Sequence, residues 1–577
     1  MSTALAPAFD GRSAIFAGAD VCDEAGLALS DNADRPAFED DIWDFTHVIG
    51  LPTQLSPSVR RFDFTLITAR WRLVAKELVL AMLAPRHRTV APLPRAFRNP
   101  LHVTSCRSRL DELVRFFNWL SDRATSSLQQ ITTRDCEAYL AHRRYVLDAD
   151  GAVIGENSHA TRRSAAQVVV DLVNYRDLFT ADRVPAELRP WGGATASAVA
   201  EMPSGRDENK TQPVADDIMQ PMLAAALYLM STLGPHAVDL AHKIRESDLH
   251  SARRAQGLRR VGPKNRVPVR ELSEILAEYT RTCTALPMLE DHYISKRLEK
   301  GWAEDDPLLP VAMGTLARRA GLSQFCHPWL PAMRSVLEDA LAQVGVERPF
   351  GRDADLVTAA DGASSVPWTL PVSRLQAVAL VGIVRTAAII TTAAISGMRA
   401  SELMELRIGC RRPPGAGESV PGLSRYRIAS KIVKGQPLGG TDDEWVVIEP
   451  VYRAIELLEQ LHDAPAEGAL LIGRFSFNVR FKRFKNWANS EAGRRLGLAP
   501  IPEGPVNLRM LRRTLSLEMA YRPGGVLATK IHMKHIAVAT TEGYADPREL
   551  HQTGEKPQVA CSRREPDGLR HYYDLTS

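Results

Sequence analysis

Residues 377–395 form the stretch that most restricts how this chain can fold. The run is almost wholly apolar and, as a helix, is long enough to cross a lipid bilayer, which takes about 20 residues. Arg385 stands at its centre, however, and a charged side chain at the middle of a bilayer is costly. A sharp Ser396-Gly397 corner then ends the run. We therefore predict a helix buried in a protein core, and no membrane association.

The length and composition are those of an ordinary multidomain globular protein. With 577 residues the chain exceeds what one core usually spans, so we expect two to four domains. The net charge of +4 does not by itself indicate nucleic-acid binding. The seven cysteines include no CxxC pair, which favours reduced thiols in a cytoplasmic protein. The N-terminus has neither a basic start nor an apolar core, so we expect no secretory signal.

The first third of the chain is predicted to be helical after an acidic start. Residues 1–55 carry several Asp and Glu residues, and we interpret them as an irregular extension. Between 56 and 190, apolar residues recur at spacings of three and four, which predicts about four helices. One of these helices should begin near Thr132 and Asp135. Pro, Gly, Ser and Ala then accumulate, and we interpret 191–212 as a linker.

Positive charge gathers in one loop. Residues 251–270 contain seven Lys or Arg residues and no acidic residue, interrupted by Gly and Pro. Contact with phosphates would suit this loop, because each neutralised phosphate releases counterions. A merely solvated loop fits the pattern equally well. Residues 271–370 match no pattern that we can assign, so we place an insertion at about 245–370.

Two segments in which apolar and polar residues alternate predict a β-hairpin. Residues 426–431 and 445–448 flank a turn rich in Gly and Pro. Asp442, Asp443 and Glu444 precede the second segment, and we interpret them as turn residues, because adjacent acids in an extended strand do not converge on one ion. The sequence has no GxxxxGK[ST] loop and no convincing metal-ligand spacing. We therefore expect no cofactor and no metal.

Aromatic and basic residues interleave in residues 475–495. We expect a helix whose aromatic side chains pack inward and whose cations point outward. The residues concerned are Phe475, Phe477, Phe481, Phe484 and Trp487 on one side, and Arg480, Lys482, Arg483 and Lys485 on the other. Such a helix suits contact with DNA, although a merely solvated face fits the same pattern.

The helix predicted over about 507–520 places two arginines beside its apolar stripe. At about 100° per residue, the stripe consists of Leu508, Leu511, Leu515 and Met519. Arg512 lies about 40° from the middle of the stripe and should be half buried. A buried guanidinium needs a partner, and a phosphate in a cleft would serve. Arg509 lies three residues earlier on the same side.

Arg399 follows the Ser396-Gly397 corner and precedes a helix that should start at Ser401-Glu402. An arginine fixed between two packed helices suits a bidentate clamp on a phosphate. On its own, however, this pattern favours a structural ion pair of Arg399 with Glu402 or Glu405.

Four residues in order carry a resemblance to a known family. Arg399 follows the Ser-Gly-Met corner, Arg512 stands in Leu-Arg-Arg-Thr-Leu, and a later segment runs from His535 to Thr-Thr-Glu-Gly-Tyr544. These motifs resemble those of the tyrosine recombinases, the phage-integrase family. The resemblance implies that Tyr544 is the catalytic nucleophile, that Arg399 and Arg512 bind the scissile phosphate, and that His535 donates a hydrogen bond to it.

The resemblance also assigns two further residues and shows two departures. The general acid of the family is a hairpin lysine, which Lys431 matches best, with Lys434 as a close rival. Arg509 stands where the family usually has His, and an arginine cannot act as a general base near neutral pH. Lys534 stands where the family commonly has Gly, so the turn must be built differently if a positive φ is needed. We interpret His532 as structural.

The resemblance is clearest over about 372–550 and weaker over about 60–190. It implies a mainly α fold with a small β-hairpin or sheet. A helical core-binding domain at 56–190 and a catalytic domain at 213–550 would form a clamp on DNA. Residues 551–577 would be a C-terminal tail that docks on a neighbouring copy.

The implied activity is site-specific cutting and rejoining of DNA through a 3′-phosphotyrosine, for a mobile element. The partners implied are double-stranded DNA and three further copies of the chain, in a tetramer on two DNA sites, and the location implied is the cytoplasm, at the nucleoid. Two alternatives remain open: a type IB topoisomerase, and a DNA-binding accessory protein that does not cleave. Arg509 and Lys534 are the features that favour the accessory protein.

Overall fold

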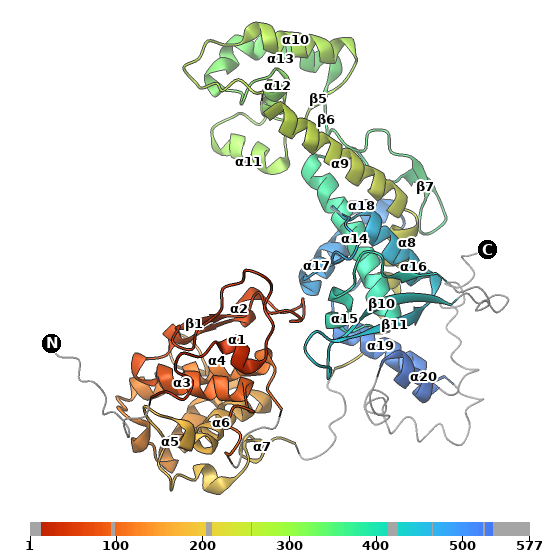
Figure 1. Ribbon diagram of the computed structural model, residues 1–577. Helices are drawn as coiled ribbons and strands as arrows, with labels where there is room; N and C mark the ends of the chain where they lie inside the picture. Colours follow the sequence, from red (N-terminus) through yellow and green to blue (C-terminus); the bar gives the residue numbers. More distant parts are fainter. Residues whose placement is uncertain are drawn as a thin grey trace. The chain divides into compact units, whose positions relative to one another are not determined.

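The computed structural model describes residues 13–93, 99–203, 211–255, 257–413, 425–463, 465–522 and 525–534. The chain forms two compact units (Figure 1). The first comprises Met1–Asp207 with Val433–Thr441, and the second comprises Glu208–Ile432 with Asp442–Ser577. The described elements are mostly helices, with only small two- and three-stranded sheets, so the predicted mainly α fold is confirmed.

Four helices build the core of the first unit. They are α3 (Ala69–Leu83), α4 (Val103–Asp122), α5 (Thr133–His142) and α6 (His159–Asn174). Helix α4 packs against both α3 and α6, and Trp71 of α3 stacks on Phe117 of α4 with ring centroids 5.2 Å apart. Helix α5 begins where the sequence predicts, because Thr132 and Asp135 form a capping box.

The core of the first unit also includes residues from 13–55, which we expected to form an irregular extension. The elements here are α1 (Val21–Ala25) and β1 (Ile42–Asp44), and β1 pairs antiparallel with β2 (Arg61–Asp63). Phe16, Trp43 and Phe45 are buried in the same core as α3 and α4. The sequence pattern missed this because single aromatics far apart show no period, although each buries a large apolar area.

Part of the predicted linker is folded as well. Helix α7 (Ala196–Val199) packs against α6, and Ala196 and Ala200 are buried. The small side chains that suggested a linker serve close packing here. The other α-helix and strands described in the first unit are α2 (Pro57–Arg60), β3 (Tyr145–Leu147) and β4 (Val153–Glu156), and four short 3-10 helices lie between the longer elements.

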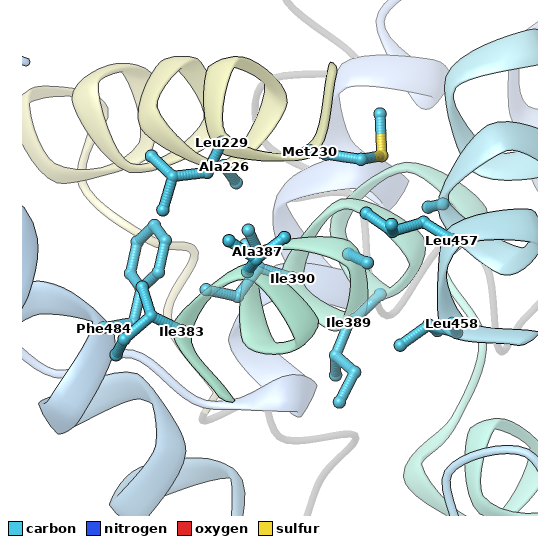
Figure 2. Packing of buried hydrophobic residues seen from close by; sticks show 14 of the residues in the cluster. Ala226, Leu229, Met230, Ile383, Ala387, Ile389, Ile390, Leu457, Leu458 and Phe484 are labelled. Atoms are coloured by element: carbon cyan, nitrogen blue, oxygen red, sulfur yellow. The ribbon is translucent and has the colours of Figure 1, made fainter. Parts of the chain in front are cut away.

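The second unit is built around α14 (Arg374–Ser396), which contains the apolar run of 377–395. This helix is long and apolar enough to cross a membrane, but 67% of its most apolar window is buried inside the protein. The helices packed against it are α8 (Asp216–Ser231), α9 (Gly234–Ala255), α16 (Glu449–Gln460), α17 (Phe477–Ala488) and α19 (Leu508–Ala520). Figure 2 shows Ile390 of α14 among Leu229 of α8 and Leu457 of α16. The predicted core helix is confirmed.

Helix α14 begins and ends at residues that are typical of helix termini. Ser373 and Gln376 form a capping box at its start. Gly397 ends it in the left-handed conformation, with φ 62°. A Cβ on this glycine would lie 2.7 Å from the end of the Met533 side chain and 3.0 Å from that of Leu515, so a larger residue would have to displace these side chains and hold a strained positive φ. The corner leads directly to Arg399.

Three strands form a small sheet in the second unit. They are β9 (Arg411–Arg412), β10 (Tyr426–Ile432) and β11 (Thr441–Val447), with β10 in the middle. The predicted hairpin is therefore present, and Ile428 and Trp445 face the core. Asp442, Asp443 and Glu444 belong to β11, so their interpretation as turn residues was wrong. Asp443 pairs with Lys534, a partner too distant in the sequence for local pattern to indicate.

A separate hydrophobic cluster lies within the insertion predicted at about 245–370. The helices α10 (Val269–Arg281), α12 (Met313–Arg319) and α13 (Leu330–Val344) enclose Leu276, Trp329 and Met333. Val357 and Trp368, by contrast, belong to the core around α14. The remaining helices and strands of the second unit are α11 (Asp291–Glu299), α15 (Ala400–Met404), α18 (Glu491–Arg495), α20 (Gly525–His532), β5 (Leu286–Pro287), β6 (Val346–Glu347), β7 (Leu356–Thr358) and β8 (Ser365–Pro367). The limits of the insertion stay a prediction.

Candidate active site

The buried carboxylate of Glu402 lies in the first turn of α15 and holds Arg399 in place. The backbone N of Arg399 donates to Glu402 Oε2 at 2.7 Å, and Arg399 Nη1 donates to Oε1 at 2.6 Å. This reciprocal contact between the residue before a helix and its third residue is a capping-box arrangement. The ion pair with Glu402 is thus present, and it fixes Arg399 at the corner.

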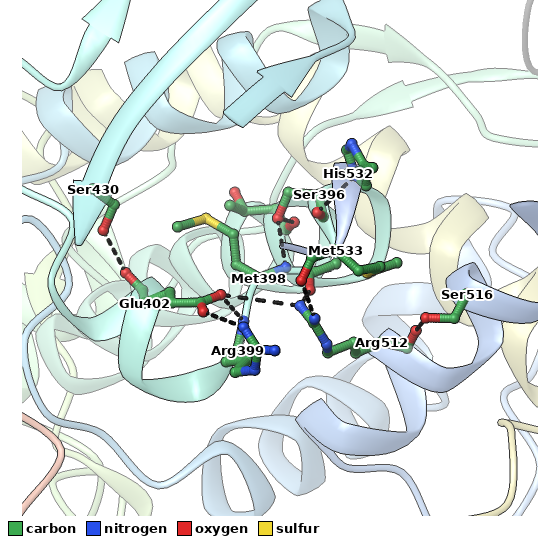
Figure 3. Close-up of polar contacts among 11 residues, drawn as sticks. Ser396, Met398, Arg399, Glu402, Ser430, Arg512, Ser516, His532 and Met533 are labelled. Carbon is green, nitrogen blue, oxygen red and sulfur yellow. Dashed lines mark hydrogen bonds and ion pairs between the residues drawn. The ribbon is translucent and has the colours of Figure 1, made fainter. Parts of the chain in front are cut away.

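Arg512 reaches the same carboxylate from α19. Its Nη1 lies 4.0 Å from Glu402 Oε2. Nη1 also donates to the carbonyl oxygen of Gly397, and Nη2 donates to that of Met533 at 2.5 Å. Two arginines from distant segments therefore meet at one carboxylate, as Figure 3 shows.

Arg512 is buried more deeply than its periodicity predicts. We expected a half-buried side chain, but the residue is only 3% exposed. The buried face of α19 includes Met510, Thr514 and Ser516 beside Leu511, so it is broader than the predicted stripe. Helix α20 packs against α19, and the residue after it, Met533, supplies a carbonyl acceptor. The Nη1 and Nη2 atoms thereby find acceptors inside the protein, which lowers the cost of burying the guanidinium.

This cluster has two cationic groups against one carboxylate. The Glu402 and Arg512 side chains are buried, whereas that of Arg399 is 22% exposed. A guanidinium presents several donors in one plane and can hold two phosphate oxygens at once. The arrangement therefore suits an anion that approaches from the exposed side of Arg399.

Strand β10 is attached to the cluster by Ser430. The Ser430 Oγ donates to the backbone carbonyl of Glu402 at 2.7 Å. Lys431 is the next residue on β10 and is partly exposed, whereas Lys434 follows the strand and is exposed. The strand that carries Lys431 is thus fixed to the helix that holds Arg399. The choice between Lys431 and Lys434 stays a prediction.

Of the other predicted site residues, Arg509 lies within the described part of the chain, whereas His535 and Tyr544 do not. Arg509 is exposed in the first turn of α19, where its backbone N donates to Asn507 Oδ1 at 3.0 Å. His535 and Tyr544 lie outside the described residues, as does the tail of 551–577. The assignment of a nucleophile and of a second phosphate donor therefore still rests on the sequence.

His532 connects α20 to the end of α14. Its Nε2 donates to the Ser396 carbonyl oxygen at 3.0 Å. Burial is the main cause that lowers the pKa of this imidazole, and the charges of Arg512 and Lys534 lower it further. The ring is thus kept neutral at this contact, in agreement with the structural role that we predicted.

Lys534 adopts a positive φ of 54°. We expected that a lysine in place of the family's common glycine would require a differently built turn if a positive φ were needed. The turn instead keeps the positive φ and places the lysine in it. Positive φ is uncommon for a residue other than Gly, Asn or Asp.

Helix α17 largely has the predicted two-sided character. Phe477, Phe481 and Phe484 are buried, while Lys482 and Arg483 are exposed. Arg480 is only partly exposed, and Lys485 departs completely from the prediction. Lys485 is buried and forms an ion pair of 2.5 Å with Glu503.

Three arginines gather where α17 packs on α14. The Arg480 guanidinium lies 5.6 Å from the centre of the Phe475 ring, and Arg385 Nη2 donates to the Leu471 carbonyl at 3.2 Å. Burial lowers the pKa of Arg480, and the charges of Arg385 and Arg483 lower it further. No carboxylate among the described residues pairs with any of the three. This group, with Lys482, is a positive surface suited to a phosphate backbone.

Helix α9 extends to Ala255 and α10 starts at Val269, so the basic loop predicted over 251–270 was wrong at both ends. The segment also offers less free charge than its composition suggests. Arg259 pairs with Glu271 at 2.9 Å, and Arg270 pairs with Glu274 at 2.8 Å. Arg260, Lys264 and Arg266 are exposed, so part of the loop stays available to an anion. Both interpretations of this loop therefore remain open.

Sequence reasoning missed the shared role of Glu402. We named it only as a partner that would make Arg399 structural, yet its carboxylate meets both arginines. The signal was present, because an acidic residue three positions after a helix-starting residue is typical of a capping box. In the part of the chain that the structure describes, no group of three or more His, Cys, Asp or Glu residues is arranged to hold a metal ion.

Comparisons with known proteins return recombinases among solved structures. No family model matches the chain, and no curated protein matches it. The chain is similar to XerH site-specific recombinase bound to palindromic difH substrate in a post-cleavage complex, with a TM-score of 0.35, 10% identity and 83% of each chain covered. A pre-cleavage complex of XerH has a TM-score of 0.35 and 10% identity, covering 88% of this chain and 97% of the other. XerA recombinase has a TM-score of 0.21 and 14% identity, covering 59% and 98%. These solved proteins are recombinases.

Proposed function

We propose that this chain is a site-specific DNA recombinase that cuts and rejoins double-stranded DNA through a 3′-phosphotyrosine at Tyr544. The observation that supports this most is the meeting of Arg399 and Arg512 at Glu402. Two guanidiniums from distant segments, one of them partly exposed, form a positive site of the kind that a DNA phosphodiester requires.

The chemistry conserves the number of phosphodiester bonds. The Tyr544 oxygen attacks the phosphorus and loses its proton, the bond from phosphorus to the 5′ oxygen breaks, and Lys431 protonates the leaving oxygen. A 5′-hydroxyl from the partner duplex then attacks the phosphotyrosine and releases the phenol. One ester replaces another at each step, so the reaction needs no ATP. Arg399, Arg509 and Arg512 stabilise the extra charge on the five-coordinate phosphorus, with His535 as a further donor.

DNA contact is proposed to extend beyond the phosphate at the site. Lys482 and Arg483 are exposed on α17, and Arg385 and Arg480 lie beside them with no carboxylate partner among the described residues. The helical domain of 56–190 is proposed to grip the other face of the duplex. A tetramer on two DNA sites, a role in a mobile element and a location at the nucleoid complete the proposal.

Covalent trapping tests the proposal. The protein is mixed with a nicked suicide substrate, from which the leaving strand diffuses away, and the DNA-linked protein is measured on a denaturing gel. The wild type should accumulate an adduct and Tyr544→Phe should form none. An adduct that survives this substitution refutes the nucleophile. DNA binding without any adduct from the wild type would indicate the accessory protein instead, and relaxation of supercoils without recombination of paired sites would indicate the topoisomerase.

A further inference from the structure

Lys534 forms several side-chain contacts with one strand. Its Nζ lies 3.0 Å from Asp443 Oδ1 and donates to the Glu444 carbonyl oxygen at 2.9 Å. The same ammonium lies 5.5 Å from the centre of the Trp445 ring. All three partners are consecutive residues of β11. The Asp443 and Lys534 side chains are 33% and 23% exposed, so the ion pair is partly shielded from water.

These contacts are formed although the backbone of Lys534 is unfavourable for a lysine. Its φ of 54° is a conformation that glycine adopts freely and that a residue with a Cβ rarely adopts. Glycine would therefore build the turn with less strain, but it would leave Asp443 without this ammonium. The side chain of Lys534 offsets the backbone strain through its contacts with β11.

Lys534 also completes a ring of contacts around the site. Met533, the residue before it, accepts a hydrogen bond from Arg512. Arg512 lies beside Glu402, whose carbonyl accepts a hydrogen bond from Ser430 of β10. Strand β10 pairs with β11, and β11 binds Lys534. Two connections therefore join residues 533–534 to the strand pair that carries Lys431. One runs from Met533 through Arg512 and Glu402 to β10, and the other is the direct contact of Lys534 with β11.

We propose that Lys534 is a positioning residue that sets where the chain enters the His535–Tyr544 segment relative to the strand pair of Lys431. The inference rests on the proposed function, because it concerns the same reaction. Breaking the contacts with β11 should leave DNA binding intact and slow cleavage. A misplacement of about 1 Å at a reacting group can cost about 100-fold in rate.

Single-turnover cleavage of the nicked substrate tests this, with DNA affinity and thermal stability measured on the same full-length variants. Lys534→Gly should keep or raise stability, bind DNA within about twofold of wild type, and cleave about 10- to 100-fold more slowly. Asp443→Asn should slow cleavage similarly, and the double variant should be no slower than Lys534→Gly alone, because both changes break the same contact. Lys534→Arg should recover most of the rate.

Two matched variants control for charge. Lys530→Met removes a cation from α20, four residues before Lys534, and Asp442→Asn removes an exposed acid one residue before Asp443; both should cleave at the wild-type rate. If the wild type forms an adduct and Lys534→Gly cleaves equally fast, Lys534 has no positioning role. If Lys534→Gly loses stability and rate together and Lys534→Arg does not restore the rate, the turn and not its contact with β11 matters. If the wild type forms no adduct, the proposed function fails and this inference fails with it.

Discussion

Two glutamates, one in each unit, are fully buried and have opposite surroundings. Glu77 of α3 accepts hydrogen bonds from the backbone N and the hydroxyl of Thr180, and no cation pairs with it among the described residues. Burial raises its pKa to about 6. Glu402 of α15 lies instead between the guanidiniums of Arg399 and Arg512. Burial alone therefore does not define what a carboxylate does; the groups that enclose it decide whether it serves as a hydrogen-bonded structural acid or as the negative centre of a cationic site.

The largest effect should come from removing the charge of Glu402. In Glu402→Gln, Arg512 stays buried without its carboxylate, and breaking a buried pair in this way costs about 3–5 kcal/mol. We expect that loss in the free energy of unfolding from denaturant titration, together with faster hydrogen exchange in peptides that contain α15 and α19. Glu518→Gln removes an exposed carboxylate from α19; it is the control and should cost much less. Equal losses in the two variants would remove the contrast between the glutamates.

Glu77→Gln should have a smaller effect of opposite sign. The folded pKa of about 6 lies above the ordinary value of 4.5, so the folded state binds more protons between these values and stability falls as pH rises from about 4.5 to 6. Glutamine mimics the protonated acid and should remove this loss, which amounts to about 1–2 kcal/mol above pH 6. Unfolding of the full chain at pH 4 and pH 8 measures it. A pH dependence that is unchanged in the variant would contradict the assignment.

Thr180→Val should have the smallest effect. The substitution keeps the shape of the side chain but removes the hydroxyl that donates to Glu77, at a cost of about 1 kcal/mol. It should also raise the pKa of Glu77 further, because a donor to the charged form is lost. Carboxyl titration followed by infrared spectroscopy reports that direction. A lowered pKa would show that the Thr180 hydroxyl does not stabilise the carboxylate.

Local sequence patterns predicted the helices and strands of this molecule better than they predicted which residues those elements contact. The apolar run of 377–395 predicted α14, because a long run with one central arginine leaves few alternatives to a core helix. The helical periodicity of residues 507–520 also predicted that Arg512 faces the core. The periodicity could not predict how deeply Arg512 is buried, because that depends on Gly397 and Met533, which approach from other segments.

Two further features could not be read from the sequence, for physical reasons. Phe16 and Trp43 are buried in the core of the first unit as single aromatic residues. A single buried residue produces no periodic pattern in the sequence. Asp443 was interpreted as a turn residue because its partner, Lys534, becomes a neighbour only after folding. His535 and Tyr544 lie beyond the described residues, so their place beside Arg399 stays a prediction.

The cluster of Leu276, Trp329 and Met333 has a consequence for how this protein can be altered. Because these side chains form a hydrophobic core distinct from the one around α14, a large-to-small substitution among them should loosen that core without opening a void beside Arg399 and Arg512.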